Sequence, residues 1–394
     1  MRKFFLTIAA LALFASCDYG LWDHPFNSPR SKVISSGEGV GHRIGAPVPG
    51  EKTDTSVYIC GVRVPEGYDW QKDTALGIGR GEVFLLKDMK EVTAFSTGYA
   101  EYSGTDPDTH HLIDGHLYTE FSTSTHTMIK CDGKALVLYE GREFLSGLVS
   151  RGGDVYTLGR RRSGRGFTYR KNGEIILDIS EGTVFGSFQD PSYPRTGALY
   201  EDKGVICFAY FDEGTSCVHL VEDGEDRIMN GSMKTPVGSD VKICRGQLYA
   251  ANVIGAGGLV YTSFGVSSVV ASGYIWSSCS IFDTGSDICL VGNVAGGYHT
   301  RSAVYSAAAR QVRVYEYEDF NIRCRDGIVT LVPAAYQGYH CFSRECQDFC
   351  GDDDYAVLSP TDGSPPVLRK NGEDAVIGIN GYLTGVEVYV SPPS

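Results

Sequence analysis

Tyr169-Arg170-Lys171-Asn172-Gly173-Glu174 is the most informative segment for the fold, because five of its six residues return unchanged later in the chain. Arg-Lys-Asn-Gly-Glu recurs at 369–373, shifted by 199 positions. Strand-like segments at 154–158 and 353–357 precede the two copies at the same distance. Asn-Gly between apolar runs predicts a β-hairpin, because a type I′ turn needs positive φ at both central residues. The chain therefore carries an internal repeat built on a hairpin.

Weaker copies of this turn lie before and between the two complete ones. Candidate turns fall near residues 88, 132, 172, 223, 264, 308 and 371. A second series of short β-rich runs is in phase with them and begins near Val57, Leu117, Val155, Val205, Leu248, Ile288 and Ile328. Each unit therefore reads as strand, loop, strand, tight hairpin, strand, connection and strand.

The spacing of these units favours a β-propeller. Most steps span about 40–50 residues, the length of a four-stranded propeller blade. The last step is longer, and a cysteine-rich insertion at about 335–353 accounts for it. We expect an all-β propeller over residues 56–394, with seven blades favoured and six or eight left open. A strand from near Lys32 could close the ring with residues 386–390, and a pair of β-sandwiches is the alternative fold.

The composition agrees with a folded β protein and argues against several classes. The chain has 49 glycines in 394 residues, and few glycine-free segments show helical periodicity, which argues against a helical bundle. With 42 % hydrophobic residues it can form a core, so wholesale disorder is not expected. The net charge of −13 argues against a nucleic-acid partner, which requires a basic face.

The first residues have the pattern of an export signal. Residues 1–3 are positively charged at Arg2 and Lys3, and residues 4–14 are apolar apart from one threonine. The apolar run is too short to span a bilayer as a helix. Phe14-Ala15-Ser16-Cys17 resembles a bacterial lipobox, which implies that residues 1–16 are removed and that Cys17 receives the lipid. An ordinary signal peptide with an incidental cysteine is the alternative.

Residues 17–55 are expected to form a lipidated N-terminus and a flexible tether. The segment is rich in proline, glycine and serine and shows little periodicity. No later apolar run has transmembrane length. These features predict an exported protein that is lipid-anchored to the bacterial outer membrane, with its periplasmic or surface placement left open.

The lipobox, the tether and the Lys-Asn-Gly-Glu repeats together resemble a group of bacterial β-propeller lipoproteins from gut anaerobes. In that group a tryptophan often precedes Lys-Asn-Gly, whereas Tyr169-Arg170 and Leu368-Arg369 occupy that place in this chain. The resemblance covers about residues 57–390. It implies a propeller fold and an envelope location, and it implies no particular activity.

The chain has twelve cysteines, and nine of the eleven that follow Cys17 fall into two groups. Six lie in apolar or alternating runs, where a cysteine acts as a small buried hydrophobe: Cys60, Cys207, Cys217, Cys244, Cys279 and Cys289. Cys341, Cys346 and Cys350 are clustered beside a histidine, and an oxidising compartment favours a disulfide-stapled loop there. Their spacing lacks the second half of a zinc site, so we expect no metal.

The sequence contains no recognisable catalytic motif, such as a G-x-S-x-G elbow, a P-loop or H-E-x-x-H. Five acids could line a central funnel, but they follow the repeat and fit turn chemistry: Asp114, Asp154, Asp287, Asp326 and Asp353. His110, His111 and His116 could serve metal or acid–base chemistry, although unpatterned loop histidines are more often bystanders. We therefore expect no catalytic residue, no metal and no cofactor.

One basic run stands out in this acidic chain, and it consists of Arg160, Arg161, Arg162 and Arg165. Its predicted place is a loop on one rim of the propeller. Guanidinium groups bind carboxylates and phosphates through charge-assisted hydrogen bonds, so the run is a candidate site for an acidic glycan or a lipid phosphate. A solvated loop is the alternative interpretation.

Together these features predict a lipid-anchored binding module of the cell envelope, with a glycan or a protein as ligand and no catalytic activity. Two alternatives stay open. A polysaccharide hydrolase or lyase would need acids that converge in one funnel and depart from the repeat. A structural subunit of an envelope assembly would need a contiguous apolar patch on one rim.

Overall fold

The structure is a computed structural model of the chain. It describes residues 43–44, 55–70, 81–96, 110–122, 125–141, 143–161, 165–186, 197–229, 239–254, 258–263, 266–270, 274–284, 286–296, 299–315, 320–325, 328–333, 338–340, 346–350 and 353–390. Within these residues the strands form eight antiparallel sheets. No helix of this part of the chain has the length and apolarity needed to cross a membrane. The predicted signal peptide and Cys17 lie outside the described residues.

The first four sheets follow one another along the chain, except that the first includes the last strand. The first joins β34 (Gly381–Val390), β2 (Thr55–Arg63), β3 (Glu82–Lys87) and β4 (Lys90–Ser96). The second joins β5 (His110–Ile113), β6 (His116–Ser122), β7 (His126–Cys131) and β8 (Lys134–Glu140). The third joins β9 (Glu143–Arg151), β10 (Asp154–Arg161), β11 (Phe167–Lys171) and β12 (Glu174–Ile179). The fourth joins β13 (Thr183–Val184), β14 (Tyr200–Asp202), β15 (Val205–Asp212), β16 (Cys217–Glu222) and β17 (Glu225–Ile228).

The other four sheets complete the ring. The fifth joins β18 (Asp240–Cys244), β19 (Gln247–Ile254), β20 (Gly258–Ser263) and β21 (Val266–Val270). The sixth joins β22 (Ile275–Trp276), β23 (Ser280–Asp283), β24 (Ile288–Gly296), β25 (His299–Ser306) and β26 (Gln311–Tyr315). The seventh joins β1 (Arg43–Ile44), β28 (Ile328–Pro333) and β27 (Phe320–Arg325). The eighth joins β29 (Tyr339–His340), β30 (Gln347–Cys350), β31 (Asp353–Pro360), β32 (Val367–Lys370) and β33 (Glu373–Val376).

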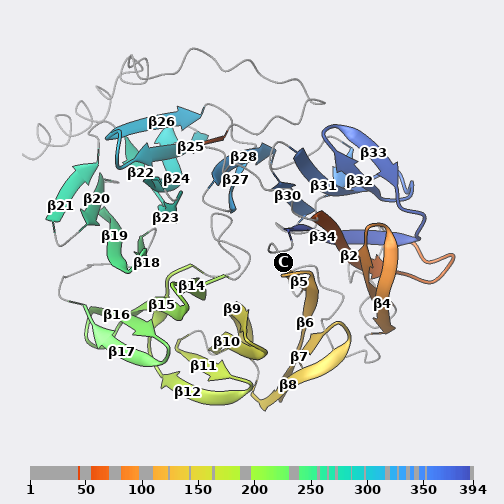
Figure 1. Cartoon of the computed structure of the whole chain (residues 1–394), viewed down its shortest axis with the longest axis horizontal. Coiled ribbons are helices and arrows are strands. Elements are labelled where there is room, and N and C mark those ends of the chain that lie inside the picture. Colours follow the sequence, from red (N-terminus) through yellow and green to blue (C-terminus); the bar gives the residue numbers. More distant parts are fainter. Residues whose placement is uncertain are drawn as a thin grey trace, which may run out of the picture.

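Figure 1 shows these sheets around a central axis in chain order, so the expected all-β propeller of small, mostly four-stranded blades is confirmed. The favoured count of seven blades is wrong. The long step between the turns near 308 and 371 was assigned to one unit with an insertion, but it holds both the β27–β28 pair and a separate sheet around β31. Gln347–Cys350 of the cysteine-rich segment is strand β30, which pairs with β31.

The two ends of the described chain close the ring. β34 pairs with β2 along its whole length, from Thr55 opposite Val390 to Arg63 opposite Gly381. The expected partner near Lys32 was therefore wrong, because the first strand of the repeat itself accepts the closing strand. Arg43–Ile44, which the sequence assigned to the tether, instead pairs with β28 as β1.

The core lies between neighbouring sheets and is rich in aromatic rings. Tyr169 on β11 contacts Phe208 on β15, with ring centroids 5.1 Å apart. Phe167 meets Tyr210 edge-on at 5.0 Å. All four side chains are buried, so these tyrosines serve packing between blades, as expected. Five of the six strand cysteines are also buried, namely Cys60, Cys207, Cys244, Cys279 and Cys289, whereas Cys217 is half-buried.

Two hydrogen bonds of the asparagine side chain hold the repeated turn. Asn172 and Gly173 have φ values of 51° and 87°, as the type I′ turn requires. The Asn172 side chain accepts a bond from Val155 N at 2.8 Å and donates one to Asp154 Oδ1 at 2.7 Å. The turn between β11 and β12 thereby fixes the start of β10, the neighbour of β11 in the sheet. Asn371 repeats both bonds in the eighth sheet.

Replacing Asn172 with alanine should lower the free energy of unfolding by about 1–3 kcal/mol, because alanine loses both bonds and is strained at positive φ. Asn172→Gly also removes the bonds, but glycine adopts a positive φ without strain. This variant should therefore lose less stability than Asn172→Ala. Urea denaturation of the two variants measures the difference. Equal stabilities for Asn172→Ala and the parent protein would contradict this role.

Candidate functional site

The predicted arginine run lies at one edge of the third sheet. Arg160 and Arg161 end β10, Arg165 precedes β11, and Arg162 lies outside the described residues. The Arg160 guanidinium carbon is 5.8 Å from the ring centroid of Phe144, at the start of β9. We call Arg160, Arg161, Arg165 and Phe144 the arginine rim. Phe144 keeps 37 % of its surface exposed, so the rim presents an aromatic ring as well as cations.

Acidic residues hold two of the three described arginines of the rim. Arg161 forms an ion pair with Asp178 on β12. Arg165 Nη1 lies 3.7 Å from Glu213 Oε2, which belongs to the loop after β15 in the next sheet. Within the described residues, no carboxylate lies within ion-pair distance of Arg160. Arg160 is therefore the cation of the rim that can turn its hydrogen-bonding fork towards an added anion.

The turn acids that the sequence singled out have structural partners. Asp154 accepts bonds from Lys171 and Asn172, which lower the pKa of its carboxyl. Asp287 accepts a bond from Ala308 N at 2.8 Å, and Asp114 occupies a turn with a φ of 53°. These acids stabilise turns, in agreement with the sequence-based interpretation. Asp326 lies outside the described residues.

The cysteine cluster is described only in part, because Cys341 lies outside the described residues. Cys346 is buried, and its sulfur lies 3.6 Å from Thr384 O and 3.9 Å from Leu383 O on the closing strand. Cys350 is half-buried at the end of β30. The predicted disulfide-stapled loop stays a prediction.

The three candidate histidines have different surroundings. His110 and His111 are buried on β5, and His110 Nδ1 lies 2.9 Å from Thr384 Oγ1 of the closing strand. His116 is more than half exposed at the start of β6. Of the three, His116 is therefore the one that solvent species can reach.

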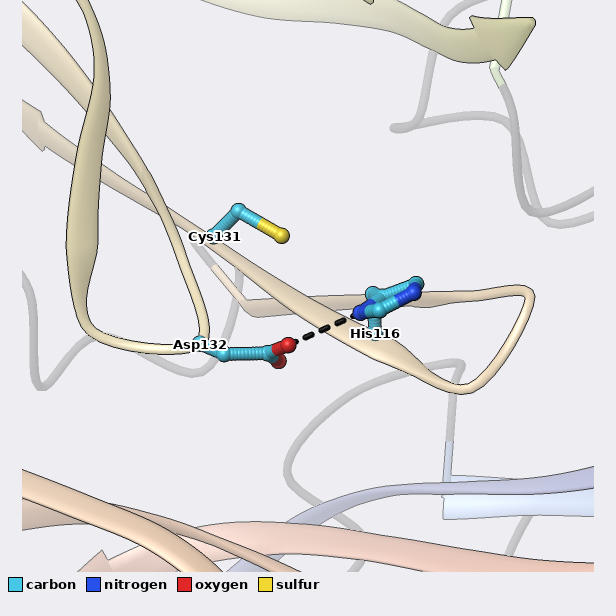
Figure 2. Close-up of side chains that lie close together, drawn as sticks. All are labelled: His116, Cys131 and Asp132. Atoms are coloured by element: carbon cyan, nitrogen blue, oxygen red, sulfur yellow. Dashed lines mark hydrogen bonds and ion pairs between the residues drawn. The ribbon is translucent and has the colours of Figure 1, made fainter. Parts of the chain in front are cut away.

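His116 lies beside two further potential ligands, as Figure 2 shows. Its Nδ1 is 2.8 Å from Asp132 Oδ2, and Cys131 Sγ completes a set whose atoms all lie within 4.8 Å of one another. Cys131 ends β7 and Asp132 begins the turn to β8. Burial and the neighbouring Asp132 raise the pKa of the Cys131 thiol. Sequence reasoning singled out His116 but missed its two partners.

A buried histidine in the fourth sheet was also missed. His219 Nδ1 lies 3.0 Å from Asp226 Oδ1, and the His219 ring stacks on Tyr210 with centroids 4.7 Å apart. The Tyr210 hydroxyl donates to Asp226 Oδ2 at 2.8 Å. The predicted hairpin at 223–224 could have revealed this pair, because its register places His219 diagonally opposite Asp226.

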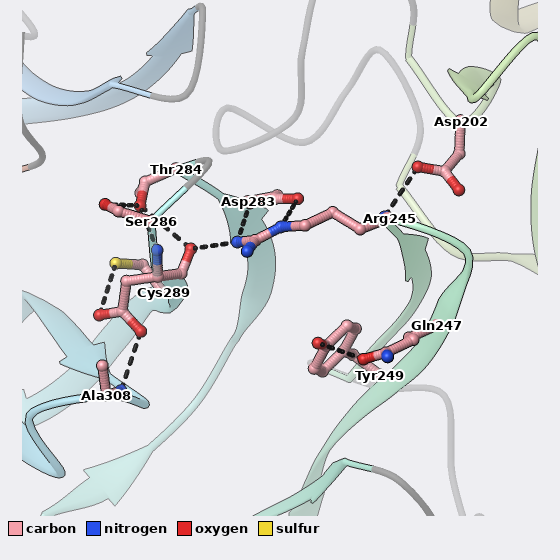
Figure 3. A network of polar contacts seen from close by, with 10 residues as sticks. Asp202, Arg245, Gln247, Tyr249, Asp283, Thr284, Ser286, Cys289 and Ala308 are labelled. Atoms are coloured by element: carbon pink, nitrogen blue, oxygen red, sulfur yellow. Dashed lines mark hydrogen bonds and ion pairs between the residues drawn. The ribbon is translucent and has the colours of Figure 1, made fainter. Parts of the chain in front are cut away.

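A further network joins three successive sheets and is drawn in Figure 3. Asp202 on β14 accepts bonds from the backbone nitrogens of Arg245 and Gly246, at 2.8 and 2.7 Å. The Arg245 side chain in turn holds Asp283 at the end of β23, with Nε 2.7 Å from Oδ2. The charged side chains of this network bind turns of neighbouring sheets, so the network holds successive blades together.

Comparison with known proteins finds no matching family model and no matching curated protein. Among solved structures, the chain is similar to Kluyvelomyces marxianus Hsv2, with 10 % identity over 76 % of this chain and 93 % of that one, at a TM-score of 0.39. It is similar to an oligogalacturonate lyase in complex with manganese, with 13 % identity over 86 % and 98 % of the two chains, at a TM-score of 0.36. A puromycin hydrolase mutant complexed with PGG gives 13 % identity, a TM-score of 0.41, and coverage of 81 % of this chain but half of that one. At this level of likeness these structures assign no activity to the chain.

Proposed function

We propose that this propeller is a lipid-anchored binding module of the bacterial outer membrane, and that it binds an anionic glycan at the arginine rim. The observation that carries the proposal is the pairing of exposed Arg160 with the partly exposed ring of Phe144. The lipobox-like sequence ending at Cys17 supports the location.

The chemistry of the rim suits an acidic sugar. A guanidinium fork can bind a uronate or phosphate group through two parallel hydrogen bonds. An aromatic ring beside it offers apolar surface for the face of a sugar ring. The carboxylates paired with Arg161 and Arg165 neutralise part of the positive charge of the rim. An anionic ligand is therefore expected to bind at Arg160. Binding, rather than catalysis, is further supported by the structural use of the turn acids.

A hexasaccharide of galacturonic acid and its neutral, fully methyl-esterified counterpart provide a matched pair of probes. Calorimetric titration of the full chain should detect binding of the acidic form only. Arg160→Ala should weaken that binding at least about tenfold, the equivalent of losing one charge-assisted hydrogen bond.

Arg227→Ala is the matched control, because Arg227 is an exposed, ion-paired arginine on the outer strand β17 of another sheet. It should leave the affinity unchanged. Equal affinities for the charged and neutral sugars, or an unchanged affinity in Arg160→Ala, would refute the proposed site. Capture of an envelope protein that survives Arg160→Ala would favour a protein ligand instead.

A further inference from the structure

The two complete repeats place an ion pair beside the turn. In the third sheet, Lys171 Nζ lies 2.7 Å from Asp154 Oδ2. In the eighth sheet, Lys370 Nζ lies 2.9 Å from Asp353 Oδ2. In both, the acid is the first residue of the strand that the turn fixes, and the lysine comes just before the turn asparagine. Three repeat positions therefore meet at one point of the blade.

The second sheet brings the same three positions together with different residues. Asp132 accepts a bond from Leu117 N at 2.9 Å and donates its own backbone N–H to Leu117 O at 2.9 Å. Asn172 makes the same two bonds with Val155. The register is thus identical, and it aligns His116 with Asp154, and Cys131 with Lys171. An acid, a lysine and an asparagine are replaced by a histidine, a cysteine and an aspartate.

Two other described sheets form the same turn bond, in which Val57 N donates to Asp88 Oδ1 and Ile206 N donates to Asp223 Oδ1. Their corresponding residues are Ser56 with Lys87, and Val205 with Glu222. Neither pair supplies an imidazole nitrogen or a thiol sulfur. Among these five aligned sheets, the second alone departs from the repeat towards a set of metal-binding side chains.

We propose that His116, Cys131 and Asp132 form a zinc-binding site at the turn edge of the second sheet. Zinc is bound in proteins by imidazole nitrogen, thiolate sulfur and carboxylate oxygen, and three protein ligands leave a fourth position for water. The mixed soft and borderline donor set disfavours calcium and magnesium, which take oxygen ligands.

The geometry requires only small movements. Ligand atoms of a tetrahedral zinc site are about 3.3–3.8 Å apart, given bonds of about 2.0–2.3 Å. The three ligand atoms already lie within 4.8 Å of one another, and Figure 2 shows Cys131 and Asp132 pointing towards the exposed His116 ring. The ion would replace the proton shared by His116 and Asp132. The Leu117 N–H holds the other carboxylate oxygen and so orients Asp132.

Cobalt(II) substitution tests the site independently of the proposed glycan binding. The full chain should bind one equivalent of Co²⁺ with a thiolate-to-cobalt charge-transfer band, and Zn²⁺ should displace it. Cys131→Ser should abolish the band, and His116→Ala should weaken Zn²⁺ binding at least about tenfold. Cys217→Ser, which changes another half-buried cysteine, should leave the band and the affinity unchanged.

The repeat itself provides matched variants, which are expected to fold because the turns share one register. Replacing the three residues by those of the third sheet, in His116→Asp/Cys131→Lys/Asp132→Asn, should keep the thermal stability and abolish metal binding. The reverse exchange, Asp154→His/Lys171→Cys/Asn172→Asp, should add a second equivalent of bound Co²⁺. A charge-transfer band that persists in Cys131→Ser, or no Co²⁺ binding by the folded parent protein at millimolar metal, would overturn the proposal.

Discussion

Replacing Arg170 with alanine is expected to lower the free energy of unfolding by about 3–5 kcal/mol, because it removes the buried guanidinium that balances the charge of the Glu143 carboxylate. Arg170 and Glu143 have only 5 % and 7 % of their side chains exposed. The guanidinium donates to both oxygens of Glu143, at 2.5 and 2.8 Å, and lies 4.0 Å from the Tyr139 ring centroid of the neighbouring sheet. Gly159 makes the contact possible, since a Cβ there would overlap the Glu143 carboxylate.

Arg369 is the matched control, because it occupies the same position of the repeated motif. It pairs with Asp374 at a more exposed site, so Arg369→Ala should lose only about 1 kcal/mol. The double variant Glu143→Leu/Arg170→Met should recover most of the stability lost in Arg170→Ala, because no unpaired charge remains buried. Urea denaturation of all three variants supplies the values. Equal losses of unfolding free energy in Arg170→Ala and Arg369→Ala would contradict the larger contribution expected of the buried pair.

Removing the carboxylate of Glu387 should lower the free energy of unfolding by about 3 kcal/mol, because one buried and one part-buried backbone donor lose a charged acceptor. Glu387 lies on the closing strand β34 and is buried. Its two oxygens accept bonds from Asp114 N at 3.1 Å and Gly115 N at 2.7 Å, in the first turn of the second sheet. The bond therefore ties the closing strand to the next blade.

Asp202→Ala is the control for Glu387→Ala, since Asp202 accepts bonds from the same two turn positions between the fourth and fifth sheets. The Arg245 turn that it holds is exposed, so water can replace the lost acceptor and the expected loss is about 1 kcal/mol. Thermal unfolding scans compare the two variants. A loss in Glu387→Ala no larger than in Asp202→Ala would mean that closure does not depend on this contact.

The hairpins could be predicted from the sequence because their determinants are local. Asn172 and Asn371 precede glycine, and the left-handed backbone of that turn is encoded by the two residues themselves. Their recurrence implied the blade and hence the propeller. Burial of the strand cysteines could be predicted for the same reason, since the neighbouring residues alternate in polarity.

The closure and the blade count could not be predicted, because they depend on pairing between distant segments. Thr55 and Val390 are partners in the ring, and no local signal distinguishes β2 from a strand near Lys32 as the partner of β34. Nor does the sequence reveal that Arg43–Ile44 adds to β28. Long-range pairing of this kind is fixed by the packing of the whole ring.

The candidate sites show the same division. The arginine run could be identified from its charge, whereas the acids that hold it come from strand β12, at Asp178, and from a loop of the next sheet, at Glu213. His116 was visible in the sequence, but Cys131 and Asp132 reach it only through the hairpin register. Side chains that follow the repeat proved structural, and the departures from it became apparent once the sheets were aligned.

A crystal structure of the full chain with the galacturonic acid hexasaccharide will show directly whether the arginine rim binds the acidic sugar. We expect electron density for a uronate group against the Arg160 guanidinium, with a sugar ring over Phe144. Density for the sugar at the opposite turn edge of the sheets, or along the propeller axis, would contradict it.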